Sequence, residues 1–271
     1  MRVRGPLGVE RGIVQGAVVV TEGGACVAPS DPETLALPDS YELLLPVEPP
    51  EVWCAGVTYE RSRDARIEES AAKDVYTLVY EAERPELFLK DACCRRTVGP
   101  GEPIGVRSDS SWDVPEPEIG LVLGENGAIA GVTIGNDVSS RDIEGANPLY
   151  LPQAKVYAGA CALGPAVLCP APDEPLAIRM RITDAEGREL YAGETSTARM
   201  KRSFQELVGF LVRDNPVPPG SVLLTGTGLV PPDDFTLEPG HVVEIHVPEI
   251  GTLVNPVVLA SSLLERSAAH V

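Results

Sequence analysis

Histidine is scarce in this chain, which has three in 271 residues, at His241, His246 and His270. None of them lies in an HExxH segment, and no GxSxG segment offers a nucleophilic serine. Zinc enzymes and serine hydrolases depend on such arrangements. The shortage of histidine therefore disfavours both classes.

Long apolar runs and basic patches are also missing. No stretch approaches the roughly 20 apolar residues that span a bilayer, and the opening MRVRGPLGVERG lacks the apolar segment of a secretion signal. The formal net charge is −18, and no Lys/Arg cluster is interleaved with aromatic residues. The sequence therefore predicts neither a membrane nor a nucleic-acid partner.

The six cysteines contain no CxxC pair and are widely spaced, apart from the adjacent Cys93 and Cys94. Such spacing favours reduced thiols over a disulfide framework or a metal site. The neighbouring pair could be a redox pair or two inert thiols. The prediction is a cytoplasmic protein with free cysteines.

Glycine and proline are frequent, with 26 of each, while aromatic residues make up 5% of the chain. This composition favours strands joined by turns, with small aliphatic side chains filling the core. We therefore predict a β-rich α+β protein. Residues 1–47 are predicted to form a small N-terminal β segment, and residues 48–271 the catalytic domain.

Three segments have clear local patterns. Residues 179–193 alternate polar and apolar side chains around the turn residues DAEG, which predicts a β-hairpin. Ser203 and Glu206 have the spacing of a capping box ahead of an apolar stripe, which predicts a helix over 203–214. Residues 60–85 are charged and contain no proline before Pro85, which predicts one or two helices near the site.

Three carboxylates are the candidate metal ligands. Glu116 and Glu118 stand two residues apart before an apolar strand, so both side chains point to one face, roughly 7 Å apart along the backbone. Asp137 ends a second apolar run, VTIGND. Mg²⁺, Mn²⁺ and Ca²⁺ prefer such oxygen ligands. The spacing alone is also compatible with a solvated edge strand that carries surface glutamates and a turn aspartate.

Other polar residues follow in the same part of the chain. Lys155 is a candidate base, since a lysine close to a metal and partly desolvated accepts a proton more readily; it could also be an ordinary surface lysine. The TGTG loop at 225–228 offers backbone N–H groups and hydroxyls to an anion, or is simply a tight turn. The candidate substrate contacts are Ser139, Ser140, Arg141, Asp142, Thr225 and Thr227. Helix capping and a local ion pair are the alternatives for residues 139–142.

In combination these motifs resemble the fumarylacetoacetate hydrolase family. The resemblance covers roughly residues 50–260. Its motifs are the E-x-E of 116–118, NDVSSRD at 136–142, Lys155, LLTGTG at 223–228 and IGTLVNPV at 250–257.

The resemblance implies a mixed β-roll that forms a homodimer or a dimer of dimers. It implies Mg²⁺ or Mn²⁺ held by Glu116, Glu118 and Asp137, and a 2-oxo acid as the substrate. Lys155 matches the active-site lysine of the family, and Thr227 matches its substrate-binding threonine.

One departure from the family pattern narrows the expected activity. Many hydrolases of the family carry a water-activating histidine in the region that reads GVTYERSRDARIEES here, and this chain has none. The resemblance is therefore to the 2-keto-3-deoxy-pentonate dehydratase branch, which forms a metal-stabilised enolate and releases water. Lys155 is the expected base, with Glu60 or Glu69 as a second catalytic candidate. The alternatives are a C–C hydrolase or decarboxylase acting on an acylpyruvate, and a binding protein without activity.

Overall fold

The computed structural model describes residues 1–6, 8–15, 18–27, 35, 37–62 and 78–268, and only the backbone of 265–268. Strands dominate, and they form three larger sheets and one short pair. The predicted β-rich α+β class is therefore confirmed. Glu69 and most of the predicted helical segment 60–85 lie outside the described residues, although 60–62 and 78–81 are helical.

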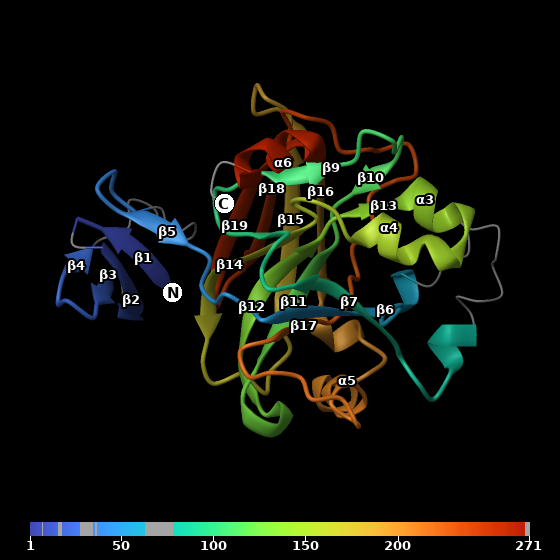
Figure 1. The fold of residues 1–271 in the computed structure, drawn as a ribbon, viewed down its shortest axis with the longest axis horizontal. Helices are drawn as coiled ribbons and strands as arrows, with labels where there is room; N and C mark the ends of the chain where they lie inside the picture. The colour runs from blue at the N-terminus through green and yellow to red at the C-terminus, as the bar shows by residue number, and fades with distance from the viewer. Residues whose placement is uncertain (7, 16–17, 28–34, 36, 63–77, 269–271) are drawn as a thin grey trace.

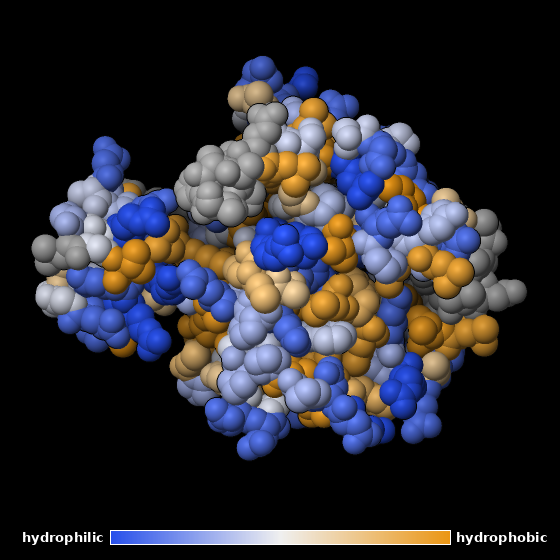
Figure 2. Space-filling model, viewed as in Figure 1, coloured by the Kyte–Doolittle hydropathy of each residue, from blue (hydrophilic) through white to orange (hydrophobic). Residues whose placement is uncertain are grey.

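The first sheet is formed by the N-terminal residues and has the order β4-β3-β2-β1-β5. Its strands are β1 (Arg2–Gly5), β2 (Gly8–Gln15), β3 (Val18–Thr21), β4 (Cys26–Val27) and β5 (Glu42–Leu44). Val3, Val19 and Val27 form a small core of their own. This sheet is a lobe beside the larger body, with apolar residues where the two meet (Figures 1 and 2). A domain boundary at residue 47 stays a prediction.

The second sheet is mixed, and its seven strands have the order β7-β6-β17-β11-β12-β14-β8. They are β6 (Glu51–Gly56), β7 (Glu86–Ala92), β8 (Thr97–Val98), β11 (Pro117–Leu123), β12 (Ile129–Asp137), β14 (Cys161–Leu168) and β17 (Val222–Leu224). Strand β6 runs parallel to β17, and β8 runs parallel to β14. Every residue of β11 is buried, because the strand is central and covered on both faces.

The third sheet has five strands in the order β16-β15-β18-β19-β9. They are β9 (Ile104–Val106), β15 (Ala177–Thr183), β16 (Glu189–Ser196), β18 (Val242–Val247) and β19 (Gly251–Leu259). In β15 buried residues alternate with exposed ones, so Ile178 and Ile182 enter the core while Arg179 and Arg181 face solvent. The main core joins both large sheets, since Ile119 and Ile134 of the second belong to the same apolar cluster as Ile178.

The remaining regular elements are short. They are β10 (Asp113–Val114), β13 (Ser139–Ser140), α3 (Arg141–Ala146), α4 (Leu151–Lys155), α5 (Phe204–Leu211), α6 (Ala260–Ala268) and three single 3₁₀ turns. The predicted hairpin over 179–193 is confirmed by the antiparallel pairing of β15 and β16. Among the described residues, no helix is long and apolar enough to cross a membrane.

Helix α5 begins as predicted, because the Ser203 hydroxyl accepts a hydrogen bond from the Glu206 backbone N–H at 3.1 Å. It buries Leu207, Val208 and Leu211 and ends there, three residues earlier than predicted. Asp214 has a φ of +58°, which is outside the helical region.

Ser203→Ala should lower the free energy of unfolding by about 1 kcal/mol, because the alanine leaves an N-terminal N–H of α5 without its acceptor. Urea denaturation of the variant and the wild type measures the difference. A Ser203→Asp variant, which restores an acceptor, should recover most of the loss. Equal stabilities for the wild type and the alanine variant would contradict this account of the cap.

Candidate metal centre and active site

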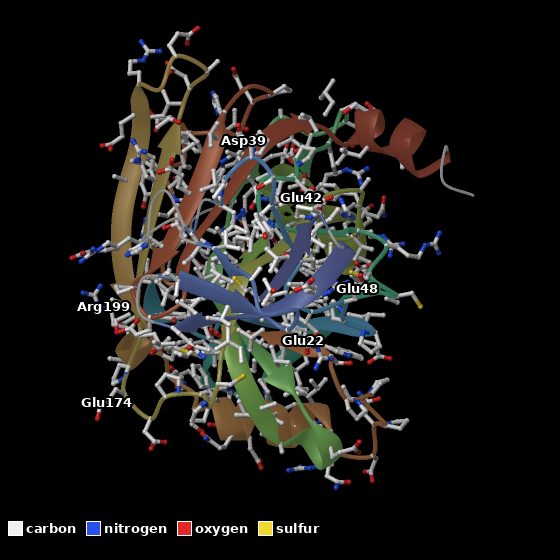
Figure 3. The ribbon with its side chains drawn as sticks, turned by 90° about the vertical axis from the view of Figure 1, so that its left-hand side faces the viewer. Glu22, Asp39, Glu42, Glu48, Glu174 and Arg199 are labelled. Atoms are coloured by element: carbon white, nitrogen blue, oxygen red, sulfur yellow. The ribbon has the colours of Figure 1, made fainter. Side chains whose placement is uncertain are left out.

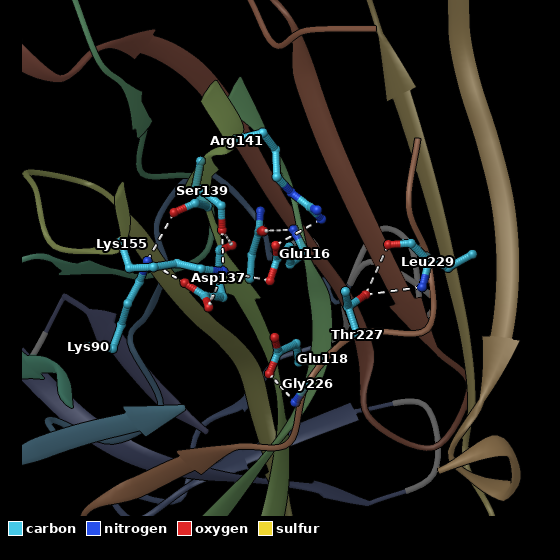
Figure 4. Close-up of polar contacts among 12 residues, drawn as sticks. Lys90, Glu116, Glu118, Asp137, Ser139, Arg141, Lys155, Gly226, Thr227 and Leu229 are labelled. Atoms are coloured by element: carbon cyan, nitrogen blue, oxygen red, sulfur yellow. Dashed lines mark hydrogen bonds and ion pairs between the residues drawn. The ribbon is translucent and has the colours of Figure 1, made fainter. Parts of the chain in front are cut away.

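The three predicted ligands come together at one end of the hairpin that β11 and β12 form. Glu116 and Glu118 flank Pro117 at the start of β11, and Asp137 is the last residue of β12. One carboxylate oxygen of each lies within 4.8 Å of the other two. All three side chains are buried, with at most 4% of each residue exposed. The solvated edge strand, which the spacing also allowed, is therefore excluded (Figure 4).

Backbone contacts fix the positions of the two glutamates. The Asn136 side chain accepts a hydrogen bond from the Glu116 N–H at 3.1 Å, and the Gly226 N–H donates to Glu118 Oε2 at 2.6 Å. Gly226 has a φ of +88°, and a Cβ there would lie 2.1 Å from the Thr58 hydroxyl. Only glycine therefore lets the TGTG loop approach Glu118 this closely.

Two cations predicted from the sequence lie against the carboxylates. Lys155, the last residue of α4, places its Nζ 2.8 Å from Glu116 Oε2 and 3.0 Å from Asp137 Oδ2, and donates to the Ser139 hydroxyl at 2.6 Å. Arg141, at the start of α3, places Nη2 3.1 Å from Glu116 Oε1. Both side chains are almost fully buried, so the structure rules out a surface lysine at position 155.

A third buried cation, Lys90, was missed by the sequence reasoning. Its side chain comes from β7, forms an ion pair with Asp137 Oδ1 and donates to the Val138 carbonyl at 3.0 Å. The only sequence signal is one lysine inside the apolar run LFLK, which is typical of a strand but gives no partner. The partner lies 47 residues away, and only the sheet brings the two together.

The triad fits a hard divalent cation. Burial, and then the negative charges of Asp137 and Glu116, raise the pKa of Glu118 well above its ordinary value. The charge of Lys155 and the Gly226 N–H offset these effects only in part. A donor set of carboxylate oxygens alone, without sulfur or imidazole, suits Mg²⁺ or Mn²⁺.

A narrow pocket opens onto the triad, and two further carboxylates line it. Glu86 comes from β7 and Glu144 from α3. The Glu86 carboxylate packs against Gly56, where a Cβ would lie 1.9 Å from Oε2. The other described lining residues include Ser62, Phe88, Leu151 and Thr227. Glu60 is exposed and is not among the described residues that line the pocket.

The backbone at both ends of segment 60–82 is held by residues 200–202. The Lys201 N–H donates to the Thr58 carbonyl at 2.9 Å. The Lys201 side chain donates to the Tyr80 carbonyl at 2.6 Å, and Arg202 Nη1 donates to the Glu83 carbonyl at 2.9 Å. These bonds hold the chain just before this segment and at its end, including the approach to β7.

Several predicted substrate contacts use their hydrogen bonds inside the protein. Asp142 accepts from the hydroxyls of Ser110, Ser111 and Ser140 and from the N–H groups of Ser111 and Ile143, at 2.7–2.8 Å. Ser140 and Asp142 therefore tie α3 to the preceding loop.

Two threonines of the TGTG loop also bond internally. Thr225 donates from its hydroxyl to the Ile119 carbonyl at 2.9 Å. Thr227 lines the pocket, and its hydroxyl bonds to the backbone of Leu229 at 3.1 Å.

The Asp142 contacts predict a pH effect on stability. Partial burial raises its pKa, but the hydrogen bonds from Ser111, Ser140 and Ser110 outweigh burial and lower it to about 2. A carboxyl group with a lowered folded-state pKa stabilises the protein above its unfolded pKa, and that stabilisation is lost as the pH falls through the folded value. The unfolding temperature of the wild type should therefore exceed that of Asp142→Asn at pH 7. The difference should shrink between about pH 4 and pH 2, as calorimetry can measure, and a constant difference would contradict this.

The family model for the fumarylacetoacetate (FAA) hydrolase C-terminal domain matches residues 51–258. The chain belongs to the fumarylacetoacetate hydrolase family. The match spans both large sheets and the whole carboxylate site, so the fold implied by the resemblance is confirmed.

Relatives within the fumarylacetoacetate hydrolase family include a probable 2-keto-3-deoxyxylonate dehydratase of Haloferax volcanii. It is 53% identical over 215 residues, which are 79% of this chain and 74% of the relative. A 2-dehydro-3-deoxy-D-arabinonate dehydratase of Saccharolobus solfataricus is 48% identical over 221 residues, or 78% of this chain and 73% of the relative.

A solved structure is similar over almost the whole length. It is a 2-keto-3-deoxy-D-arabinonate dehydratase complexed with magnesium and 2,5-dioxopentanoate, with a TM-score of 0.81 and 37% identity. The similarity covers 94% of this chain and 97% of that chain. It therefore extends beyond the region that the family model matches and into the N-terminal sheet.

Proposed function

We propose that this protein is a Mg²⁺- or Mn²⁺-dependent dehydratase of a 2-keto-3-deoxy-pentonate. The observation that carries the proposal is the buried triad of Glu116, Glu118 and Asp137 with Lys155 bonded to two of its members. The names of the two dehydratase relatives and the ligands of the solved structure support the same reaction.

The triad would hold the metal ion. A bound divalent cation is a Lewis acid that makes the C3 proton beside a keto group easier to remove. Lys155 is placed by α4 beside the triad, and we assign to its Nζ, as the neutral amine, the removal of that proton. Its bonds to Glu116 and Asp137 hold the Nζ at the metal ligands, next to where the reacting carbon has to lie.

The pocket offers an acid for the leaving group. We assign to Glu86 the transfer of a proton to the C4 hydroxyl, which leaves as water. A proton shift from C5 to C3 then gives the C4–C5 enol, and transfer of the enol hydroxyl proton to C4 gives the aldehyde of 2,5-dioxopentanoate, so the net change is the loss of one water. The sequence suggested Glu60 or Glu69 as a second candidate for the base. Among the described residues Glu86 lines the pocket and Glu60 does not, and Glu69 lies outside them.

Substrate contacts are proposed for Ser139, Arg141 and Thr227. Arg141 and Ser139 each contact a member of the ligand cluster or Lys155, and Thr227 lines the pocket. Their donors suit a carboxylate, which a chain of net charge −18 would otherwise repel. We propose that Ser140, Asp142 and Thr225 shape the site from behind, since their hydrogen bonds join neighbouring backbone and loops.

The distribution of histidine supports elimination of water over its addition. His246 lies on β18 of the third sheet and bonds to Thr252 at 2.9 Å, and the His241 ring lies against Phe235. Neither is among the described residues of the pocket. Hydrolysis needs a base for water, whereas dehydration releases water as a product.

We further propose a homodimer or a dimer of dimers that acts in the catabolism of sugar acids in the cytoplasm. The family resemblance supports the assembly, and the free thiols of Cys54, Cys93, Cys94, Cys161 and Cys169 support a reducing compartment. Light scattering coupled to gel filtration measures the assembly.

Steady-state kinetics on two substrates tests the proposed reaction. With saturating Mg²⁺, kcat/KM for 2-keto-3-deoxypentonate should exceed that for fumarylpyruvate by at least about tenfold, because the polar pocket favours hydroxyl groups. EDTA should abolish turnover, and Mg²⁺ should restore it. Faster turnover of fumarylpyruvate, with release of pyruvate, would favour the C–C hydrolase instead.

A further inference from the structure

Lys90 is the buried cation to which the proposed reaction gives no role. It lies in β7, where the ladder with β6 shifts register: Val52 pairs with Asp91 and Trp53 pairs with Leu89. Lys90 is thus the extra residue of a β-bulge and has no partner across the ladder. Bulges commonly turn a side chain in a new direction beside a functional site. Here the bulge directs Lys90 into the core, while Leu89 is exposed.

The Lys90 side chain is completely enclosed and has two polar contacts. Its Nζ forms an ion pair with Asp137 Oδ1 and donates to the carbonyl of the next residue, Val138, at 3.0 Å. The ring of Tyr157 lies 5.9 Å from the same nitrogen. Both bonds join β7 to the end of β12, so Lys90 fixes the residue that carries the third ligand.

The contacts of Asp137 divide between two lysines. Oδ1 faces Lys90 and Oδ2 faces Lys155 at 3.0 Å (Figure 4). Lys155 also contacts Glu116, which has a second cation in Arg141. Among the described residues, Asp137 is the only carboxylate that Lys90 contacts. Without it, a buried carboxylate would lose half of its positive neighbours.

We propose that Lys90 is a positioning residue and counter-charge for Asp137, which keeps the ligand cluster formed in the metal-free protein and weakens the binding of the divalent cation. A buried carboxylate that loses its partner destabilises the folded state. A divalent cation beside the same carboxylate is repelled by the ammonium group and can replace its charge. The inference rests on the metal site of the proposed function.

Lys90→Met tests the proposal, because methionine fills similar space without charge. In EDTA its unfolding temperature should fall well below that of the wild type, and saturating Mg²⁺ should close most of the gap. Calorimetric titration should show Mg²⁺ binding at least about tenfold tighter than in the wild type, because a nearby positive charge has been removed. Arg181→Met is the matched control, since Arg181 pairs with Glu244 on the surface; it should change neither quantity.

A second variant keeps the proposal testable if Lys90→Met alone does not fold. In Lys90→Met/Asp137→Asn both charges are gone, so its metal-free unfolding temperature should exceed that of Lys90→Met. If Lys90 contributed only apolar packing, the double variant would unfold at a lower temperature than Lys90→Met. The Lys90→Met substitution would then lower the unfolding temperature equally with and without Mg²⁺.

The outcomes separate this inference from the proposed function. A wild type that binds Mg²⁺, together with a Lys90→Met variant that binds it equally well or more weakly, would overturn the role of Lys90 alone. A wild type that binds no Mg²⁺ would overturn both.

Discussion

Lys155→Met should lower kcat for dehydration by about 10²–10⁴-fold, which is the range expected when a positioned acid–base group is lost. Lys155, the predicted base, places its Nζ in direct contact with two members of the ligand triad, Glu116 and Asp137. Methionine keeps the length of the side chain but can neither accept nor donate the proton. Initial rates at saturating Mg²⁺ and substrate measure the change.

Two controls make the Lys155 result specific. Arg179→Met removes an exposed cation that pairs with Glu194, and it should affect kcat far less than Lys155→Met does. Mg²⁺ titration of Lys155→Met should still show binding, because all three carboxylates remain. A Lys155→Met variant with kcat within tenfold of the wild type would remove Lys155 from the proton transfer.

Glu118→Gln should abolish turnover and weaken Mg²⁺ binding by more than about 100-fold. This loss exceeds the roughly 10–100-fold that follows mutation of residues that only support metal ligands. Burial and the charges of Asp137 and Glu116 raise the pKa of Glu118, which favours its protonated form in the metal-free protein. Glutamine resembles that neutral form. The unfolding temperature in EDTA should therefore stay near the wild-type value, while stabilisation by Mg²⁺ disappears.

Thermal unfolding with and without Mg²⁺ measures both effects on the same sample. Glu244→Gln, at an exposed pair with Arg181, is the matched control and should keep the full Mg²⁺ response. Undiminished Mg²⁺ stabilisation in Glu118→Gln would exclude Glu118 as a ligand.

Local patterns in the sequence predicted those features that local chemistry determines. The hairpin over 179–193 follows from strict alternation around turn residues, and α5 follows from a cap at Ser203 and an apolar stripe. The two-residue spacing of Glu116 and Glu118 placed them on one face of a strand. The structure adds burial, which separates a candidate metal site from a surface strand.

Features that depend on distant pairing could not be predicted in this way. Lys90 reaches Asp137 because the bulge in β7 turns its side chain into the core, and nothing in LFLKDA indicates the register shift. Glu86 enters the pocket because Gly56 on the neighbouring strand leaves room for it. Side chains in the segment 139–142 point alternately to opposite sides. Ser139 and Arg141 contact the carboxylate cluster and Lys155. Ser140 and Asp142 form hydrogen bonds with the loop at 110–111.

The site also shows how a very acidic chain can bind an acid. Acidic side chains such as Glu22, Asp39, Glu42 and Glu48 lie on the side of the N-terminal sheet (Figure 3). In the site, by comparison, Lys90, Arg141 and Lys155 accompany the three carboxylates. A divalent cation added to this set would offset the two further pocket carboxylates, Glu86 and Glu144, so an anionic substrate would meet a far less negative charge than the net charge of −18 suggests.

We expect the buried carboxylate cluster to support dehydration of a 2-keto-3-deoxypentonate. Carbon-13 NMR of the uniformly labelled acid, incubated with the protein and Mg²⁺, follows every carbon at once. The expected result is stoichiometric conversion to 2,5-dioxopentanoate, with an aldehyde or its hydrate at C5, and no conversion in EDTA. Pyruvate as the labelled product, or conversion that is unaffected by EDTA, would contradict the account.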